Sequence, residues 1–199
     1  MENVVIGLDM STKSSGYSVF KNGKLIKFGV WKQKQEIAWR ERCIYMGNEL
    51  STLLDTYSPF FIYCEDTILS GECGNNVQTV KQLSVLQGIV LGVCAVHNVK
   101  IEFLMPSKWR SDLGVYDGTR DGTKRPVMKW KTIEKINYIF GLELFYDLDK
   151  PKSVKNDDDI GDAIGIAWSQ IKPTEISKGF GKKPNINAKK GRCINIGIE

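Results

Sequence analysis

Two kinds of hydrophobic pattern alternate along the first 171 residues. Short apolar runs that are rich in β-branched or aromatic residues and lack helical spacing predict strands. Apolar residues spaced three or four positions apart predict amphipathic helices. The expected strands are 3–9, 16–20, 24–30, 60–64 and 100–105. The expected helices are 38–56, 79–96, 127–140 and 157–171.

The order of these elements limits the fold. Asn22-Gly23, between the second and third strands, is a strong hairpin signal, so three antiparallel strands are expected first. The last two strands alternate with helices, which predicts parallel crossover connections. The expected α/β fold is therefore a mixed five-stranded sheet, three antiparallel strands then two parallel ones, flanked by helices. RNase H-like domains have this order, and so does each half of the actin and sugar-kinase fold.

Composition narrows the protein class. The 199 residues are 42% hydrophobic and 26% charged, which is ordinary for a soluble globular protein and excludes wholesale disorder. No apolar run approaches the roughly 20 residues of a membrane span, so helix 79–96 is interpreted as buried and no membrane contact is expected. The N-terminus lacks a basic region and a cleavage site, so we expect a cytoplasmic protein. The five cysteines include no C-x-x-C pair, and a single histidine excludes most histidine-based catalysis.

Positive charge is concentrated at the C-terminal end. The chain carries 28 basic and 23 acidic residues, and seven basic and two acidic ones lie in 172–199. Residues 1–171 are therefore neutral, with 21 of each sign. This division predicts a folded domain at 1–171 and a basic flexible tail at 172–199. The tail is interpreted either as an arm that binds a polyanion or as a solvated segment that aids solubility.

Carboxylates follow the expected strands and open the last helix. Asp9 ends the first strand, Glu65 directly follows the fourth, and Asp159 and Asp162 lie three apart, on one helical face. Each acid also has a structural interpretation, as a strand-end or turn residue or, for 157–159, as a helix N-terminus. Asp162 lies beyond the first helical turn, where capping gains little.

If the first and fourth strands are neighbours, these four acids meet at one edge of the sheet. An all-oxygen cluster cannot stay fully ionised and empty at neutral pH. Mg²⁺ or Mn²⁺ relieves the repulsion, because hard cations prefer carboxylate ligands. Two such ions about 4 Å apart can cleave a phosphodiester without any histidine.

Four segments of the sequence resemble the RuvC family of Holliday-junction resolvases. They are IGLDMSTKSSGYSVF (6–20), FFIYCEDTILSGECGNNVQTVKQLSVLQGIVLG (60–92), MPSKWRSDLGV (105–115) and NDDDIGDAIGIAW (156–168), which contains a D-x-x-D-A core. They span nearly all of 4–171 in the family's order, and the short connections resemble a phage-encoded member. The resemblance implies an RNase H-like fold and a homodimer that nicks branched DNA, including Holliday junctions and forks. For a phage protein the location would be the host cytoplasm.

The resemblance also assigns site residues. It implies that Asp9, Glu65, Asp159 and Asp162 bind two Mg²⁺ ions, with Mn²⁺ as a substitute and Asp158 as the alternative to Asp159. The family places basic residues near the scissile phosphate. The corresponding residues here are Lys108, Lys124, Arg125, Lys129 and Lys131.

Lys129, and after it Lys131, is the preferred transition-state residue, and Lys108 is expected to contact phosphate. A solvated basic helix face is the alternative. The family often has an aromatic residue three positions after the strand-end glutamate, and this chain has Ile68, followed by Leu69. These side chains can wedge between base pairs but cannot stack as a phenyl ring does. Selectivity is therefore expected to extend to other branched DNA.

Two matched nicks in a two-fold junction require two chains, because each has one acid cluster. Helix 79–96 is the best candidate for the shared surface, with Leu86 on its outer side; the alternative is that this helix is entirely core. Two other functions remain open. One is a non-catalytic nucleic-acid-binding module of the same fold. The other is an actin-like or sugar-kinase-like nucleotide-binding protein, although such proteins need two lobes.

Overall fold

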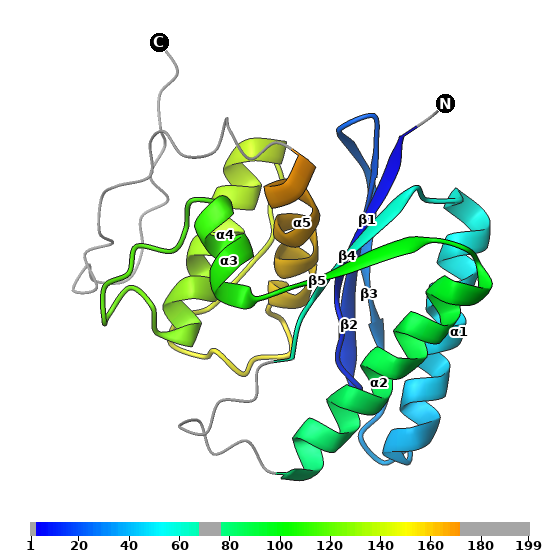
Figure 1. The fold of residues 1–199 in the computed structure, drawn as a ribbon. Helices are drawn as coiled ribbons and strands as arrows, with labels where there is room; N and C mark the ends of the chain where they lie inside the picture. Colours follow the sequence, from blue (N-terminus) through cyan, green and yellow to red (C-terminus); the bar gives the residue numbers. More distant parts are fainter. Residues whose placement is uncertain (1–2, 68–76, 172–199) are drawn as a thin grey trace.

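The computed structural model describes residues 3–67 and 77–171 (Figure 1). Five strands and five helices lie in these ranges. The strands are β1 (Val4–Asp9), β2 (Ser14–Lys21), β3 (Lys24–Lys32), β4 (Phe61–Glu65) and β5 (Lys100–Leu104). The helices are α1 (Trp39–Tyr57), α2 (Val77–Val96), α3 (Pro106–Asp112), α4 (Arg125–Phe140) and α5 (Asp158–Ile171). The basic tail expected at 172–199 lies outside the described residues.

The strands form one mixed sheet in the order β3-β2-β1-β4-β5. β1, β2 and β3 pair antiparallel, while β4 pairs parallel with both β1 and β5, which confirms the expected topology. Asn22 and Gly23 join β2 to β3 with φ of 52° and 75°. Two successive left-handed residues are what a type I′ hairpin turn requires, so the Asn-Gly signal was correct.

Helices cover both faces of the sheet, α1 and α2 on one side and α3, α4 and α5 on the other (Figure 1). The alternation along β1 explains this division, because Ile6 and Leu8 are buried in the core under α1 and α2, whereas Val5 is buried under α5. Glycine lets α5 approach the sheet closely. A Cβ on Gly7 would lie 2.1 Å from the Ala163 carbonyl oxygen, and one on Gly16 would lie 1.8 Å from that of Asp159.

The helix α3 was not predicted from the sequence. Pro106 directly follows the expected strand 100–105, and proline is favoured in the first turn of a helix, where its missing N–H has no partner to lose. It opens α3, and the fully buried Trp109 anchors that helix in the core.

The interpretation of helix 79–96 was wrong in two respects. Only Leu86, Val90 and Cys94 of α2 are buried, so the helix is largely exposed rather than buried. Leu86 is 1% exposed and faces the core under the sheet, not outward. By length and composition alone α2 could also cross a membrane, with 17% of its apolar window buried, although one such helix is weak evidence for a membrane.

Candidate active site

The carboxyl ends of β1 and β4 bring the first two acids together. Leu8 lies opposite Cys64 in the parallel register, and the next residues, Asp9 and Glu65, end the two strands side by side. The first turns of α5 lie against the same end of the sheet because of the close approach at Gly16. Asp9, Glu65, Asp159 and Asp162 consequently line one cavity of about 720 Å³, as the sequence predicted.

Asp162 is the most buried of the four acids, with 2% of its side chain exposed. Its Oδ2 accepts a hydrogen bond from Nη2 of Arg110 at 2.9 Å. Its Oδ1 is also buried and has no hydrogen-bond partner within residues 3–67 and 77–171. A buried carboxylate oxygen without a partner is costly, so this site is incomplete as it stands.

Glu65 is oriented by α3. The indole N–H of Trp109 donates to Oε2 of Glu65 at 2.8 Å, and Nη1 of Arg110 lies 3.6 Å from the same oxygen. Glu65 keeps 23% of its side chain exposed toward the cavity. The short helix missed in the sequence therefore sets the position of one of the principal acids.

The three successive aspartates at the start of α5 have different partners. Asp157 accepts a hydrogen bond from the Phe145 amide, and Asp158 forms an ion pair with Lys129. Asp159 accepts a hydrogen bond from the Ser14 hydroxyl and is the one of the three that lines the cavity. This placement favours Asp159 over Asp158 as a site residue.

Burial and neighbouring charges raise the pKa values of Asp9, Glu65 and Asp159. Burial, then the charges of Glu65, Asp162 and Asp159, raise the pKa of Asp9 well above its ordinary value. Burial also raises the pKa of Glu65, although the Arg110 guanidinium opposes that shift. The pKa of Asp159 is raised by burial as well, against the Ser14 hydrogen bond. The cluster therefore resists full ionisation.

Comparisons with known proteins agree with this arrangement. No protein-family model matches the chain. It is 23% identical over 172 residues to the crossover junction endodeoxyribonuclease RuvC of Dictyoglomus turgidum, covering 84% of this chain and 96% of that one. It is 23% identical over 187 residues to RuvC of Fusobacterium nucleatum, covering 92% and 87%. The chain resembles RuvC.

Solved structures show the same fold. RuvC of Thermus thermophilus, in complex with a Holliday junction substrate, superposes with a TM-score of 0.63 at 16% identity, over 85% of this chain and 92% of that one. The fowlpox virus resolvase, in complex with Holliday junction DNA, gives a TM-score of 0.53 at 15% identity, over 85% and 97%. The RNase H-like fold of RuvC is therefore confirmed.

The RuvC-like acid cluster suits a divalent cation by its donors and by its charge. Five carboxylates and four basic side chains line the cavity, so one net negative charge remains when all of them are ionised. The acids are Asp9, Glu65, Asp66, Asp159 and Asp162, and the basic residues are Lys13, Arg110, Arg125 and Lys129. The unpartnered Asp162 oxygen offers a ligand atom. No three His, Cys, Asp or Glu side chains in the described part of the chain already converge closely enough to form a finished metal site.

The basic residues predicted from RuvC separate into two groups. Lys129 and Arg125 line the acid cavity, and Lys129 is 10% exposed. Burial disfavours the Lys129 ammonium, but the charges of Asp162, Asp9 and Asp158 outweigh it and raise the Lys129 pKa. Lys108, Lys124 and Lys131 do not line the cavity.

These three lysines form ion pairs outside it, with Asp112, Asp121 and Asp117 respectively. Ile68 and Leu69 lie outside the described residues. Contacts with DNA by all five of these side chains remain predictions.

Sequence reasoning missed three residues that touch the acids of this RuvC-like site: Ser14, Trp109 and Arg110. Trp109 is fully buried and packs in the core, but its N–H also donates a hydrogen bond to Glu65. An apolar or hydroxyl residue carries no sequence signal for such a role. Arg110 carried a signal, because it is a basic residue in the RuvC-like segment 105–115.

Proposed function

We propose that the chain is a metal-dependent endonuclease that nicks branched DNA, with the four-way junction as its main substrate. The observation that carries the proposal is the convergence of four carboxylates, from β1, β4 and α5, on one cavity. The similarity to RuvC over 84% or more of the chain supports the substrate class. Phosphodiester hydrolysis by two metal ions is the reaction that such an oxygen-rich, histidine-free site suits best.

Asp9, Glu65, Asp159 and Asp162 are the residues that would hold the metal, with Mg²⁺ as the proposed ion and Mn²⁺ as a substitute. Bound metal supplies activation of the attacking water and neutralisation of charge on the departing oxygen. Ser14 and Trp109 each orient one carboxylate by a hydrogen bond. Lys129 stays protonated beside the acids and offers positive charge to the phosphate.

The rim of the cavity supplies groups that suit a DNA backbone. Lys13, from the turn after β1, and Arg125, at the start of α4, line it together with Thr12 and Thr79. The buried Arg42 donates to the Thr12 carbonyl and so fixes that turn. Basic and hydroxyl side chains of this kind contact phosphates and position the strand without reading its sequence.

A homodimer through α2 is part of the proposal. Ser84, Gly88 and Gly92 are exposed at four-residue spacing, and nothing lies within 4 Å of a Cβ built on either glycine. Val85 and Leu91, on the same side, are 39% and 48% exposed. An exposed apolar face with small residues lets a second helix approach closely, and a second copy of α2 would cover it across a two-fold axis.

Leu91→Lys tests this surface by placing a charge in the dimer contact. We expect monomers by light scattering, whereas Ile44→Lys on α1, at a site that is also exposed, leaves the dimer intact. A wild-type monomer, with and without junction DNA, contradicts the dimer.

Cleavage tests the function itself. A four-way junction, a three-way fork, a linear duplex and an RNA–DNA hybrid are incubated in parallel with Mg²⁺, Mn²⁺, Ca²⁺ or EDTA. We expect nicks in the branched substrates with Mg²⁺ and Mn²⁺, and binding without turnover with Ca²⁺, whose loose coordination fits such a site poorly. Junction binding with no cleavage in any metal identifies a non-catalytic module instead.

A further inference from the structure

The side chain of Arg110 lies among the acids rather than in solvent. It is 13% exposed, with Nη2 2.9 Å from Oδ2 of Asp162 and Nη1 3.6 Å from Oε2 of Glu65. Its guanidinium carbon lies 4.2 Å from the centre of the Trp109 ring. One cation thus contacts two of the four carboxylates proposed as metal ligands, one from β4 and one from α5.

Packing of α3 fixes Arg110 there. Trp109 is fully buried against α5, where a Cβ on Gly165 would lie 3.1 Å from the indole ring. The same indole donates to Glu65, so the ring that supports the guanidinium also holds one of its partners. Arg110 is therefore held by the fold, unlike an exposed arginine on a flexible surface.

In this position Arg110 would compete with a divalent cation for the same carboxylate oxygens. The guanidinium forms ion pairs with oxygens of Glu65 and Asp162 that a metal ion would need as ligands. Its positive charge also repels a metal ion, and little solvent is present to screen this repulsion. Lys129 differs, because its ion-pair partner is Asp158, which does not line the cavity. Within residues 3–67 and 77–171, Arg110 is thus the basic residue that forms ion pairs with two of the proposed ligands.

Arg110 also has spare capacity for an anion. Its Nε is buried without a hydrogen-bond partner in the part of the chain that the structure describes. The side chain lines the cavity, where a DNA backbone would pass. A phosphate matches the two-armed donor geometry of a guanidinium, so it can replace the two carboxylates as a partner.

We propose that Arg110 is an internal counter-ion that competes with the metal for Glu65 and Asp162 until a DNA phosphate accepts its guanidinium. The inference rests on the proposed function. Metal and DNA then bind cooperatively, since each removes an obstacle to the other, and linkage makes the effect equal in both directions. Arg110 is in this sense a positioning residue that couples metal loading to substrate binding.

Calorimetric titration of the DNA-free protein with Mn²⁺ tests the competition. Arg110→Met removes the charge, and we expect its Mn²⁺ Kd to fall about tenfold, within the usual range of coupling effects. Arg40→Met is the matched control, because Arg40 stacks on its neighbour Trp39 at 4.5 Å in the same way but does not line the cavity. A purely structural arginine predicts the opposite sign, with Mn²⁺ binding weakened by loss of site geometry.

Junction affinity in Ca²⁺ and in EDTA measures the coupling. In the wild type we expect Ca²⁺ to tighten junction binding, and in Arg110→Met we expect this tightening to be largely lost. Equal or weaker Mn²⁺ binding by Arg110→Met overturns the competition while leaving the nuclease proposal intact. Absence of Mn²⁺ binding in both proteins overturns the metal site and this inference together.

A second variant guards against a folding failure. If thermal melting in EDTA shows that Arg110→Met is unfolded, the Mn²⁺ affinity of Arg110→Lys tests the competition instead. This variant keeps the positive charge but cannot contact Glu65 and Asp162 at the same time with two N–H groups. Tighter Mn²⁺ binding by about threefold or more supports the competition, and unchanged binding overturns it.

Discussion

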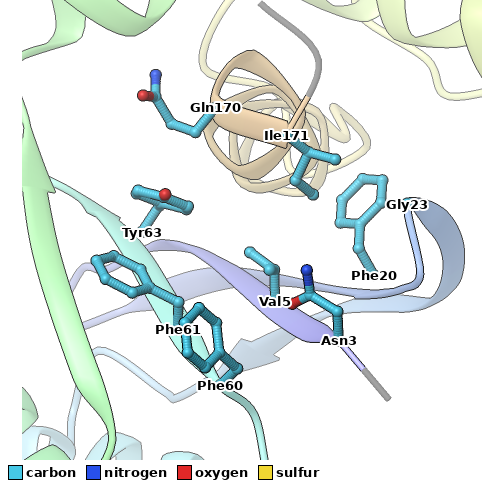
Figure 2. A pocket seen from close by; sticks show the side chains of 9 residues that line it. All are labelled: Asn3, Val5, Phe20, Gly23, Phe60, Phe61, Tyr63, Gln170 and Ile171. Carbon is cyan, nitrogen blue, oxygen red and sulfur yellow. The ribbon is translucent and has the colours of Figure 1, made fainter. Parts of the chain in front are cut away.

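The two ends of the sheet have opposite chemistry. At the end where β1 and β4 finish, a cavity of about 720 Å³ is lined by acids, basic residues and hydroxyl groups. At the other end, a smaller cavity of about 220 Å³ is lined mainly by apolar and aromatic side chains. Figure 2 shows Phe60, Phe61 and Tyr63 gathered on one side of it, with Phe20 and Ile171 on another. The centroids of the Phe61 and Tyr63 rings lie 4.7 Å apart.

Helix α5 joins these two regions. Its first turns carry Asp159 and Asp162 into the acid cavity, while Trp168 packs against Phe20 and Phe140 near its last turn. Burial raises the pKa of Asp159, so ionising this carboxyl opposes folding, whereas the buried rings stabilise the fold. A single helix, α5, therefore carries acids whose ionisation is unfavourable at its first turns and well-packed aromatic contacts near its last turn.

The free energy of unfolding should change most when a side chain of the aromatic end is truncated. Phe20→Ala should lower the free energy of unfolding by about 3–5 kcal/mol, because Phe20 is fully buried. Phe60→Ala is the matched control at 62% exposure and should cost less than about 1 kcal/mol. Urea unfolding measures both, and nicking per folded molecule should stay unchanged. Equal stability of the two variants would show that the aromatic end is not the stabilising one.

A smaller effect of opposite sign is expected at the acid end. Asp9→Asn should raise stability in EDTA at neutral pH by about 1 kcal/mol, or about 2–4 °C in Tm for a domain of this size. The reason is that burial and the neighbouring carboxylates raise the pKa of Asp9 in the fold, so ionising it costs free energy.

Proton linkage sets the direction in which the stability difference between Asp9→Asn and the wild type changes with pH. With a raised pKa, the folded state holds the Asp9 proton more tightly than the unfolded chain, so wild-type stability falls as pH rises above about 4. The advantage of Asp9→Asn should therefore grow from pH 4 to 7 and vanish below. An Asn variant less stable than the wild type at pH 7 would mean that the acid end is not strained.

Most of the fold could be predicted from the sequence, because short apolar runs, the Asn22-Gly23 turn and helical spacing are local signals. The side of α2 on which Leu86 lies could not be predicted. Helix α2 is apolar on nearly all sides, so its pattern does not distinguish the side under the sheet from the exposed one. Only tertiary packing makes that choice.

In the site, too, local sequence signals predicted some residues, whereas tertiary packing determined others. Asp9 and Glu65 were predictable because strand ends of parallel neighbours meet at one edge of a sheet. The alignment of Arg110 with Glu65 and Asp162 was not, because it depends on the short helix α3, which begins at a proline. The roles assigned to Lys108, Lys124 and Lys131 stay predictions, since their ion pairs lie outside the cavity.

A change smaller than those above is expected from the basic residues that follow α5 in the sequence. Removing 178–199 deletes six basic residues and one acidic residue. If this segment contacts phosphates, the salt dependence of junction affinity should become shallower by about 0.9 for each phosphate released. The position of the nick should not change. An unchanged slope would mean that the segment does not contact DNA.

The proposed metal-dependent cleavage of phosphodiesters at the acid end is tested by one kinetic comparison. The rate of nicking of a four-way junction is measured for the wild type and Asp162→Asn, in Mg²⁺ and in EDTA, with junction affinity measured in parallel. We expect wild-type nicking with Mg²⁺ alone, a loss of roughly 100-fold or more in Asp162→Asn because a metal-ligand charge is removed, and junction binding that is retained or tighter. Wild-type cleavage in EDTA, or normal cleavage by Asp162→Asn, would show that the acid cluster does not hold a catalytic metal.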